Sequence, residues 1–136
     1  MTIKYRFIKK ADKKNLLQII SLYSSQGWWD KTDTTKILKT ILANSHCFII
    51  AEEKEYIVGI GRAISDKISD AYIQDITVDK KYRKRHVGSK IIKRIINRLK
   101  KDKIKWIGLI AQNNSSVFYE KLGFKKMKNS LPMLKN

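Results

Sequence analysis

The part of this chain best suited to chemistry is a basic turn, Arg83-Lys-Arg-His-Val-Gly-Ser89. It joins a strand-like run at 71–78 to a strongly periodic helix that begins near Gly88. The first N–H groups of a helix have no partner within the helix, and nearby cations add positive potential. A strand, a basic turn and a helix start in this order predict a site for a phosphate-bearing ligand.

The elements around this turn can be predicted from hydrophobic periodicity. Residues 46–51 and 56–64 flank a polar turn and, with 71–78, predict an antiparallel meander of three strands. The helix at 88–101 carries an apolar stripe backed by basic residues. The nearly continuous apolar run at 104–111 predicts a central strand that lies parallel to 71–78.

The rest of the chain completes an α/β fold with a mixed, mostly antiparallel sheet flanked by helices. We expect the order β-α-α-β-β-β-α-β-α-β in one domain over residues 1–136. The other predicted elements are a strand at 3–7, helices from Asp12 to about Tyr23, from Thr32 or Asp33 to Asn44 and at 115–123, a strand at 124–128, and a short strand or ordered tail at 131–134.

Charge is the most unusual property of the composition. The formal net charge is +18, and residues 80–105 hold 13 basic residues against one acidic residue, Asp102. This balance indicates an anionic partner, which could be a polyphosphate cofactor, nucleic acid, an acidic protein or an anionic membrane. The alternative is that much of the surplus charge is solvated surface.

The small number of cysteines and histidines and the short apolar runs further limit the class of protein that this chain can be. Cys47 is alone, so no internal disulfide is possible and a reducing cytoplasm is expected. His46 and His86 are the only histidines, so we expect no metal cluster. The longest apolar run, 106–111, is far shorter than the ~20 residues that span a bilayer, so we expect no membrane segment.

Two motifs in this order resemble the GNAT (Gcn5-related N-acetyltransferase) superfamily. Val78 is followed by Arg83-Lys-Arg-His-Val-Gly88, which is similar to the family pattern Gln/Arg-x-x-Gly-x-Gly/Ala between a strand and a helix. Phe118-Tyr-Glu-Lys-Leu-Gly-Phe124 is similar to the family's carboxy-terminal signature. The order of elements also matches over almost the whole chain. The resemblance implies an acetyltransferase that uses acetyl-CoA.

The resemblance also assigns residues to the cofactor. It implies that amides between Lys84 and Ser89 hold the pyrophosphate, and that Arg83, Lys84 and Arg85 add positive charge. The backbone of 76–78 would pair with the pantetheine arm, and the Val78 N–H would polarise the carbonyl. The cofactor residues implied are Ile76, Thr77, Val78, Arg83, Lys84, Arg85, His86, Val87, Gly88, Ser89 and Asn114. Asn113 is an alternative to Asn114 for contact with the pantetheine arm.

His86 stands where the first glycine of the family pattern usually lies. Glycine there permits a tight turn and a close approach to phosphate. Histidine is among the non-glycine residues found more often at positive φ, so we expect the turn to survive. A catalytic role is not expected, because His86 would lie at the phosphate end.

The same resemblance assigns residues to the part of the site where the acetyl group would be transferred. Tyr119 matches the tyrosine that protonates the departing thiolate, and a phenol can do so at neutral pH. Asp75 could accept the amine proton directly or through water, or could hold a neighbouring turn. Trp28, Trp29, Arg62 and Gln74 are candidates for the acceptor site, although Trp28 could instead anchor the first two helices as core.

We therefore expect an acetyl-CoA-dependent N-acetyltransferase that transfers acetyl directly, in a ternary complex, to a primary amine of a small molecule or peptide. No metal is expected, and the chain could be a monomer or a homodimer. Two alternatives remain open at this stage. One is a small basic nucleic-acid-binding protein, which would lack a recognisable motif. The other is a catalytically silent fold that binds acetyl-CoA.

Overall fold

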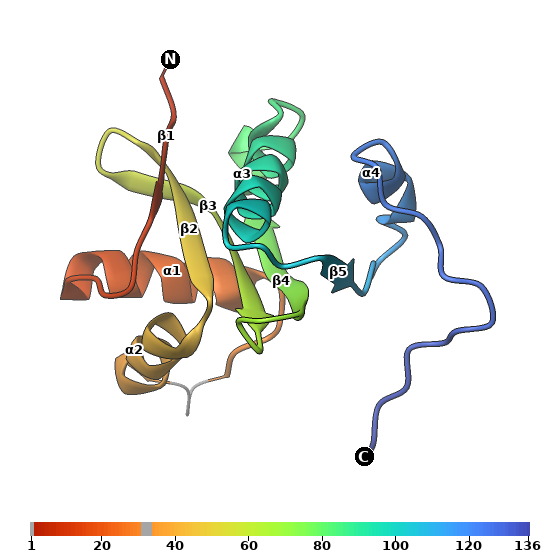
Figure 1. Cartoon of the computed structure of the whole chain (residues 1–136). Helices are drawn as coiled ribbons and strands as arrows, with labels where there is room; N and C mark the ends of the chain where they lie inside the picture. Colours follow the sequence, from red (N-terminus) through yellow and green to blue (C-terminus); the bar gives the residue numbers. More distant parts are fainter. Residues whose placement is uncertain (1, 31–33) are drawn as a thin grey trace.

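A computed structural model describes residues 2–30 and 34–136, and its centre is a five-stranded sheet in the order β1-β2-β3-β4-β5 (Figure 1). The first four strands pair antiparallel, and β5 pairs parallel with β4. The predicted meander and the predicted parallel pair are both confirmed. The strands are β1 (Lys4–Phe7), β2 (Cys47–Glu53), β3 (Tyr56–Ser65), β4 (Asp70–Val78) and β5 (Trp106–Leu109).

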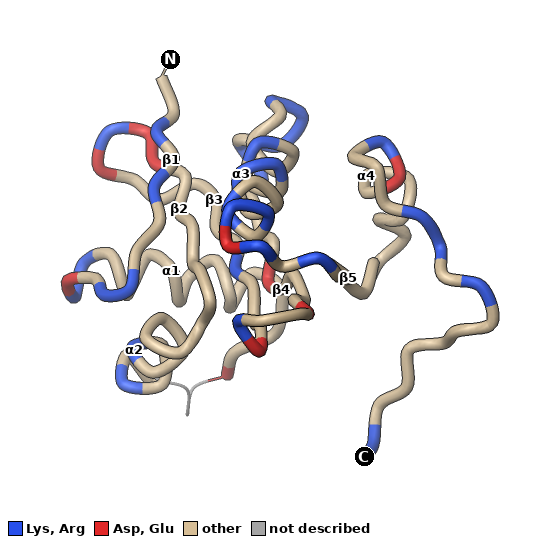
Figure 2. The backbone as a smooth tube through the Cα atoms, in the orientation of Figure 1, with Lys and Arg blue, Asp and Glu red and all other residues tan. Residues whose placement is uncertain are grey.

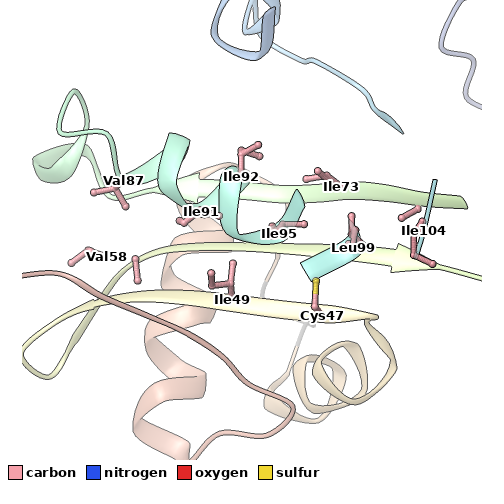
Figure 3. Close-up of a cluster of buried hydrophobic side chains, with 13 residues drawn as sticks. Cys47, Ile49, Val58, Ile73, Val87, Ile91, Ile92, Ile95, Leu99 and Ile104 are labelled. Carbon is pink, nitrogen blue, oxygen red and sulfur yellow. The ribbon is translucent and has the colours of Figure 1, made fainter. Parts of the chain in front are cut away.

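Helices cover both faces of the sheet. Side chains alternate along β2, so that Phe48 and Ile50 pack beneath α1 and α2 while Cys47 and Ile49 pack against α3. Figure 3 shows the second of these clusters, with the isoleucines of α3 lying over the strands. The helices are α1 (Lys13–Ser25), α2 (Thr35–Asn44), α3 (Val87–Lys101) and α4 (Ser116–Glu120), with a 3-10 turn, η1, at Lys80–Tyr82.

The helix starts follow from local capping. The Asp12 side chain accepts a hydrogen bond from the Asn15 N–H at 2.8 Å and caps α1 as predicted. Thr34 caps α2, whereas the predicted starts at Thr32 and Asp33 lie outside the described residues. Two glycines of β3 let α3 approach the sheet closely. A Cβ at Gly61 would lie 2.5 Å from the Cδ1 of Ile76 and 2.8 Å from the Cγ2 of Ile91.

The prediction for the C-terminal part was wrong in two respects. The run 104–111 is not a central strand, because β5 covers only Trp106–Leu109 and is the last strand in the sheet order. Residues 124–128 and 131–134 are not strands, and 125–136 are exposed. The apolar character of the run has another cause: Ile104 is buried beneath α3, and Ile107 and Leu109 pack against the same cluster.

Candidate active site

A groove of about 880 Å³ lies where β4 ends and α3 begins, with α4 on its far side. We call it the loop groove. Nine of the eleven residues predicted to hold the cofactor line it, all except Arg85 and Asn114. The nine are Ile76, Thr77, Val78, Arg83, Lys84, His86, Val87, Gly88 and Ser89.

The turn that forms the floor of the loop groove has an unusual backbone. Lys84 and His86 both adopt left-handed conformations, with φ of 63° and 64°. The expectation that histidine tolerates the position of the missing glycine is therefore confirmed. His86 is the N-cap of α3, and its side chain makes no capping hydrogen bond, so the first amides of the helix have no side-chain partner there. Open amides beside Arg83 and Lys84 suit an anion such as a pyrophosphate.

A gap in the sheet lies beside the loop groove. Pairing between β4 and β5 ends at Ile73 and Leu109, so the next residues of β4 have no strand on that side in the described chain. The Asp79 N–H donates to the Val58 carbonyl of β3 at 2.8 Å. Because strand N–H groups alternate in direction, the Val78 N–H points the other way, toward the gap. An extended ligand could therefore pair with this edge as an added strand.

A second groove, of about 600 Å³, lies along β4 on the other side of Tyr119, and we call it the strand groove. Its lining combines aromatic rings, carboxamides and one carboxylate, that of Asp75. Trp28 and Gln74 are among the predicted residues that line it. Five residues line both grooves, namely Gln26, Ile76, Arg83, Ser115 and Tyr119.

Tyr119 is held at the junction of the two grooves by aromatic contacts. Its ring makes edge-to-face contacts with Phe118 and Phe124, with centroids 5.0 and 5.9 Å apart. Burial raises the pKa of Tyr119 above its ordinary value of 10.0. The phenol is therefore protonated throughout the neutral range and can act as a proton donor.

The Asp75 carboxylate lies at the centre of a polar cluster that was not predicted from the sequence. One carboxylate oxygen accepts from the Arg62 Nε at 2.6 Å and from the Tyr23 hydroxyl at 2.8 Å. The other guanidinium nitrogens of Arg62 donate to Ser45 Oγ and Gln74 Oε1, each at 3.3 Å. Burial, followed by the nearby Asp75 charge, raises the pKa of Tyr23, which keeps that hydroxyl a donor.

This cluster stabilises an irregularity in β4. Asp75 has a φ of 61°, and the register between β3 and β4 shifts between Ile60 and Arg62. Such a bulge redirects the strand and its side chains. Arg62 therefore lies behind Asp75 rather than in the lining of either groove.

Three other predicted residues lie away from both linings. Trp29 stacks on Tyr23 at 5.1 Å and is partly buried in the core beneath α1 and α2. The Arg85 guanidinium lies 5.4 Å from the centre of the Tyr82 ring. Asn114 is exposed and precedes the helix cap, which is Ser115, while its rival Asn113 lines the strand groove.

Several lining residues were missed by the sequence analysis. Tyr72 lies two positions before Gln74, so the period of two along a strand could have placed it on the same face. Gln26 and Gln112 are loop residues with no local pattern, and only the fold brings them together. Phe118 lies within the quoted motif and lines the loop groove.

Basic residues of α3 have partners within the chain. Figure 2 shows Lys and Arg gathered along this helix. The cationic groups of Lys90 and Arg94 lie 6.0 and 5.5 Å from the centre of the Tyr5 ring, and that of Arg98 lies 5.1 Å from the Phe7 ring. Part of the basic block therefore packs against aromatic rings of β1.

Neither a membrane span nor a metal cluster is found in the part of the chain that the structure describes. Residues 2–30 and 34–136 contain no helix that is long and apolar enough to cross a membrane. Within the same residues, no three or more His, Cys, Asp or Glu side chains form a group that could hold a metal ion.

Comparison with known proteins places the chain in a family. The sequence model of the acetyltransferase (GNAT) domain matches residues 18–132. An uncharacterized N-acetyltransferase, ycf52, of Pyropia yezoensis is 31% identical over 130 residues, which are 91% of this chain and 74% of that protein. The chain therefore belongs to the GNAT acetyltransferases.

Solved structures share the fold. A protein of unknown function from meticillin-resistant Staphylococcus aureus, described as a probable acetyltransferase, matches with a TM-score of 0.82 at 24% identity over 99% of both chains. A predicted acetyltransferase from Clostridium acetobutylicum, crystallised with acetyl-CoA, matches with a TM-score of 0.74 at 22% identity over 98% of this chain and 96% of that one. The predicted fold class is confirmed.

Proposed function

We propose that this protein is an acetyl-CoA-dependent N-acetyltransferase that transfers acetyl directly to a primary amine while both substrates are bound. The observation that carries the proposal is the meeting of two grooves at Tyr119. One groove has the open amides and cations that suit a pyrophosphate, and the other is lined mainly by aromatic rings and carboxamides, together with the Asp75 carboxylate and the shared Arg83. A thioester and an amine bound in these grooves would meet beside one buried phenol.

The loop groove would bind the donor. Amides from Lys84 to Ser89 would hold the pyrophosphate, with Arg83 and Lys84 adding charge. The free edge of β4 at Ile76–Val78 would pair with the extended arm of coenzyme A, and the Val78 N–H would polarise the acetyl carbonyl. Bound acetyl-CoA supplies an activated acyl group, and the role of the chain is to orient it toward the strand groove.

The strand groove would bind the acceptor amine. Trp28 and Gln74 would contact the acceptor, and Asp75 would take the proton that the amine loses, directly or through water. As the new C–N bond forms and the C–S bond breaks, Tyr119 would donate its proton to the sulfur. Arg62 and Tyr23 would act as positioning residues, because they bind the Asp75 carboxylate.

The test is thiol release from acetyl-CoA across a panel of amines, with calorimetric binding of acetyl-CoA measured on the same preparation. We expect binding without acceptor, and release of one thiol for each acetylated amine detected by mass spectrometry. Binding with no turnover on any amine would instead support a silent acetyl-CoA-binding protein. Absence of acetyl-CoA binding, combined with salt-sensitive binding to DNA or RNA, would support the nucleic-acid alternative.

A further inference from the structure

Tyr82 and Glu53 form a hydrogen-bonded pair beside the loop groove that the proposed chemistry does not use. The Tyr82 hydroxyl donates to the Oε1 of Glu53 at 2.7 Å. Tyr82 is the last residue of η1, directly before the basic turn, and Glu53 is the last residue of β2, 29 positions earlier in the chain. The pair therefore joins two segments that are distant in the sequence, next to the turn that would hold a pyrophosphate.

The stability of the fold alone does not account for this pair. The second carboxylate oxygen of Glu53, Oε2, is buried and has no hydrogen-bond partner among the described residues. A carboxylate oxygen in this position loses its hydration without a hydrogen bond in exchange, which is destabilising. Replacing both members of such a pair by apolar groups of similar shape can be neutral or stabilising. A polar pair at this place therefore indicates a role in function.

The turn that follows Tyr82 needs support from its surroundings. Lys84 and His86 both have left-handed backbones, with φ of 63° and 64°, and this conformation is unfavourable for residues that carry a Cβ. Residues 83–86 are exposed, so burial in the core does not hold them in place. An unfavourable backbone conformation persists only where neighbouring groups fix it.

The Tyr82 ring connects Glu53 to the middle of the turn. The Arg85 guanidinium lies 5.4 Å from the centre of this ring, within the range of a cation–π contact, and Arg85 stands between the two left-handed residues. Tyr82 also packs against the apolar cluster that contains the isoleucines of α3, and it lines the loop groove. The hydrogen bond to Glu53 restrains the ring, and the restrained ring supports Arg85.

We propose that Tyr82 and Glu53 are positioning residues for the acetyl donor, because their hydrogen bond holds the turn at 83–86 in the conformation that leaves the first amides of α3 open to a pyrophosphate. Arg85 lines neither groove and would act through the same ring. The inference rests on the proposed function, since it concerns the binding of acetyl-CoA in the loop groove.

Calorimetric titration of coenzyme A into the full chain tests the inference. Tyr82→Phe keeps the ring and removes the hydroxyl, so we expect the Kd to rise about fivefold, as the loss of one hydrogen bond predicts. Tyr56→Phe is the matched control, because Tyr56 lies opposite Glu53 on β3, is 67% exposed and lines neither groove. The Kd of the control should stay within about twofold of the wild-type value.

A double variant separates positioning from stability. Tyr82→Phe alone leaves the Glu53 carboxylate without its partner, whereas Glu53→Met with Tyr82→Phe makes both positions apolar. The melting temperature of the double variant without ligand should therefore equal or exceed that of the wild type. Its Kd for coenzyme A should rise as much as that of Tyr82→Phe, since both variants lack the same hydrogen bond. A double variant that loses affinity only together with melting temperature would overturn the inference.

Steady-state thiol release adds a kinetic criterion. For any amine that is acetylated, both variants should raise the KM for acetyl-CoA by the same factor as the Kd, with kcat and the KM for the amine unchanged. A general loss of structure would instead lower kcat and raise both KM values.

Failure of the inference and failure of the proposed function give different results. A wild-type protein that does not bind coenzyme A would refute the proposed function. If the wild type binds coenzyme A and both Tyr82→Phe and the double variant bind it equally well, the positioning role alone is refuted.

Discussion

The loop groove and the strand groove share Tyr119 but are assembled differently. Most of the loop groove comes from one continuous stretch, 76–89, which the chain folds locally into a strand end, a turn and a helix start. The strand groove is assembled from separate segments: the loop after α1, the middle of β4, and the residues after β5. The shape of the loop groove therefore depends on local geometry, and the shape of the strand groove depends on tertiary packing.

The two grooves also differ in charge. The loop groove has cations on several sides, including Arg83, Lys84 and Lys93. The strand groove has one carboxylate, which is already paired with Arg62, and one cation, Arg83, which it shares with the loop groove. The first therefore suits a polyphosphate and the second suits an uncharged amine. Substitutions that affect one groove and spare the other test this difference.

Tyr119→Phe should have the largest effect, because the phenol would serve both grooves. The substitution keeps the ring and its contacts with Phe118 and Phe124 but removes the proton donor. We expect kcat to fall about 10²- to 10³-fold, with the Kd for acetyl-CoA changed less than about threefold. Steady-state thiol release and calorimetry measure the two quantities.

The pH profile adds a second criterion. Because burial raises the pKa of Tyr119 above 10.0, the phenol stays protonated throughout the neutral range, and any loss of wild-type kcat from its deprotonation should have its midpoint above pH 10.0. Tyr72→Phe is the control, since Tyr72 also lines the strand groove. A Tyr119→Phe enzyme with full kcat at every pH would exclude the general-acid role.

Asp75→Asn should destabilise the fold as well as the strand groove. Asparagine also tolerates the φ of 61°, so the main loss is the charge that Arg62 pairs with. The side chains of Arg62 and Asp75 are only 17% and 21% exposed, so we expect a loss of about 2 kcal/mol in the free energy of unfolding. Urea denaturation measures it.

Kinetics of the same variant separate two roles for Asp75. If Asp75 acts as the base, kcat of the wild type should fall at low pH, and kcat of the Asp75→Asn variant should not show this fall. A positioning residue alone would leave the shape of the profile unchanged. The Tyr23→Phe variant is a suitable comparison, because it removes one hydrogen bond to the carboxylate and keeps the charge.

Gly88→Val should affect the loop groove alone. A Cβ at this position would lie 3.4 Å from the Cζ of Phe118 and 3.7 Å from the Cγ2 of Val78, so one added carbon fits and a branched side chain does not. We expect the Kd for acetyl-CoA to rise about tenfold, which is about 1.4 kcal/mol. Gly88→Ala, the matched control, should stay within about threefold. Equal Kd values for the two variants would contradict the close approach at Gly88.

Trp28→Ala should affect the strand groove alone and have the smallest effect. We expect the KM for the amine to rise several-fold to about tenfold, because an aromatic contact of this kind contributes about 1 kcal/mol. The Kd for acetyl-CoA should not change. Trp106→Ala is the control, since Trp106 is 38% exposed, like Trp28 at 40%, but lines neither groove. If both variants raised KM equally, Trp28 would have no special role.

The elements that depend on local interactions could be predicted from the sequence. Alternation along 71–78, the cap at Asp12 and the apolar stripe of α3 predicted elements that the structure confirms. The turn at 83–89 was also predictable, because a strand end and a helix start adjoin in sequence. His86 adopts the left-handed backbone expected of a histidine in place of glycine.

Contacts between groups that are distant in the sequence could not be predicted, because they depend on how the whole chain packs. The cluster of Tyr23, Arg62 and Asp75 joins α1, β3 and β4, and no spacing in the sequence signals it. The apolar runs after residue 104 were misassigned for a related reason. Periodicity reports that a segment can pair as a strand, but it does not report whether the segment meets an edge, and residues 125–136 make no backbone hydrogen bond to any strand of the described chain.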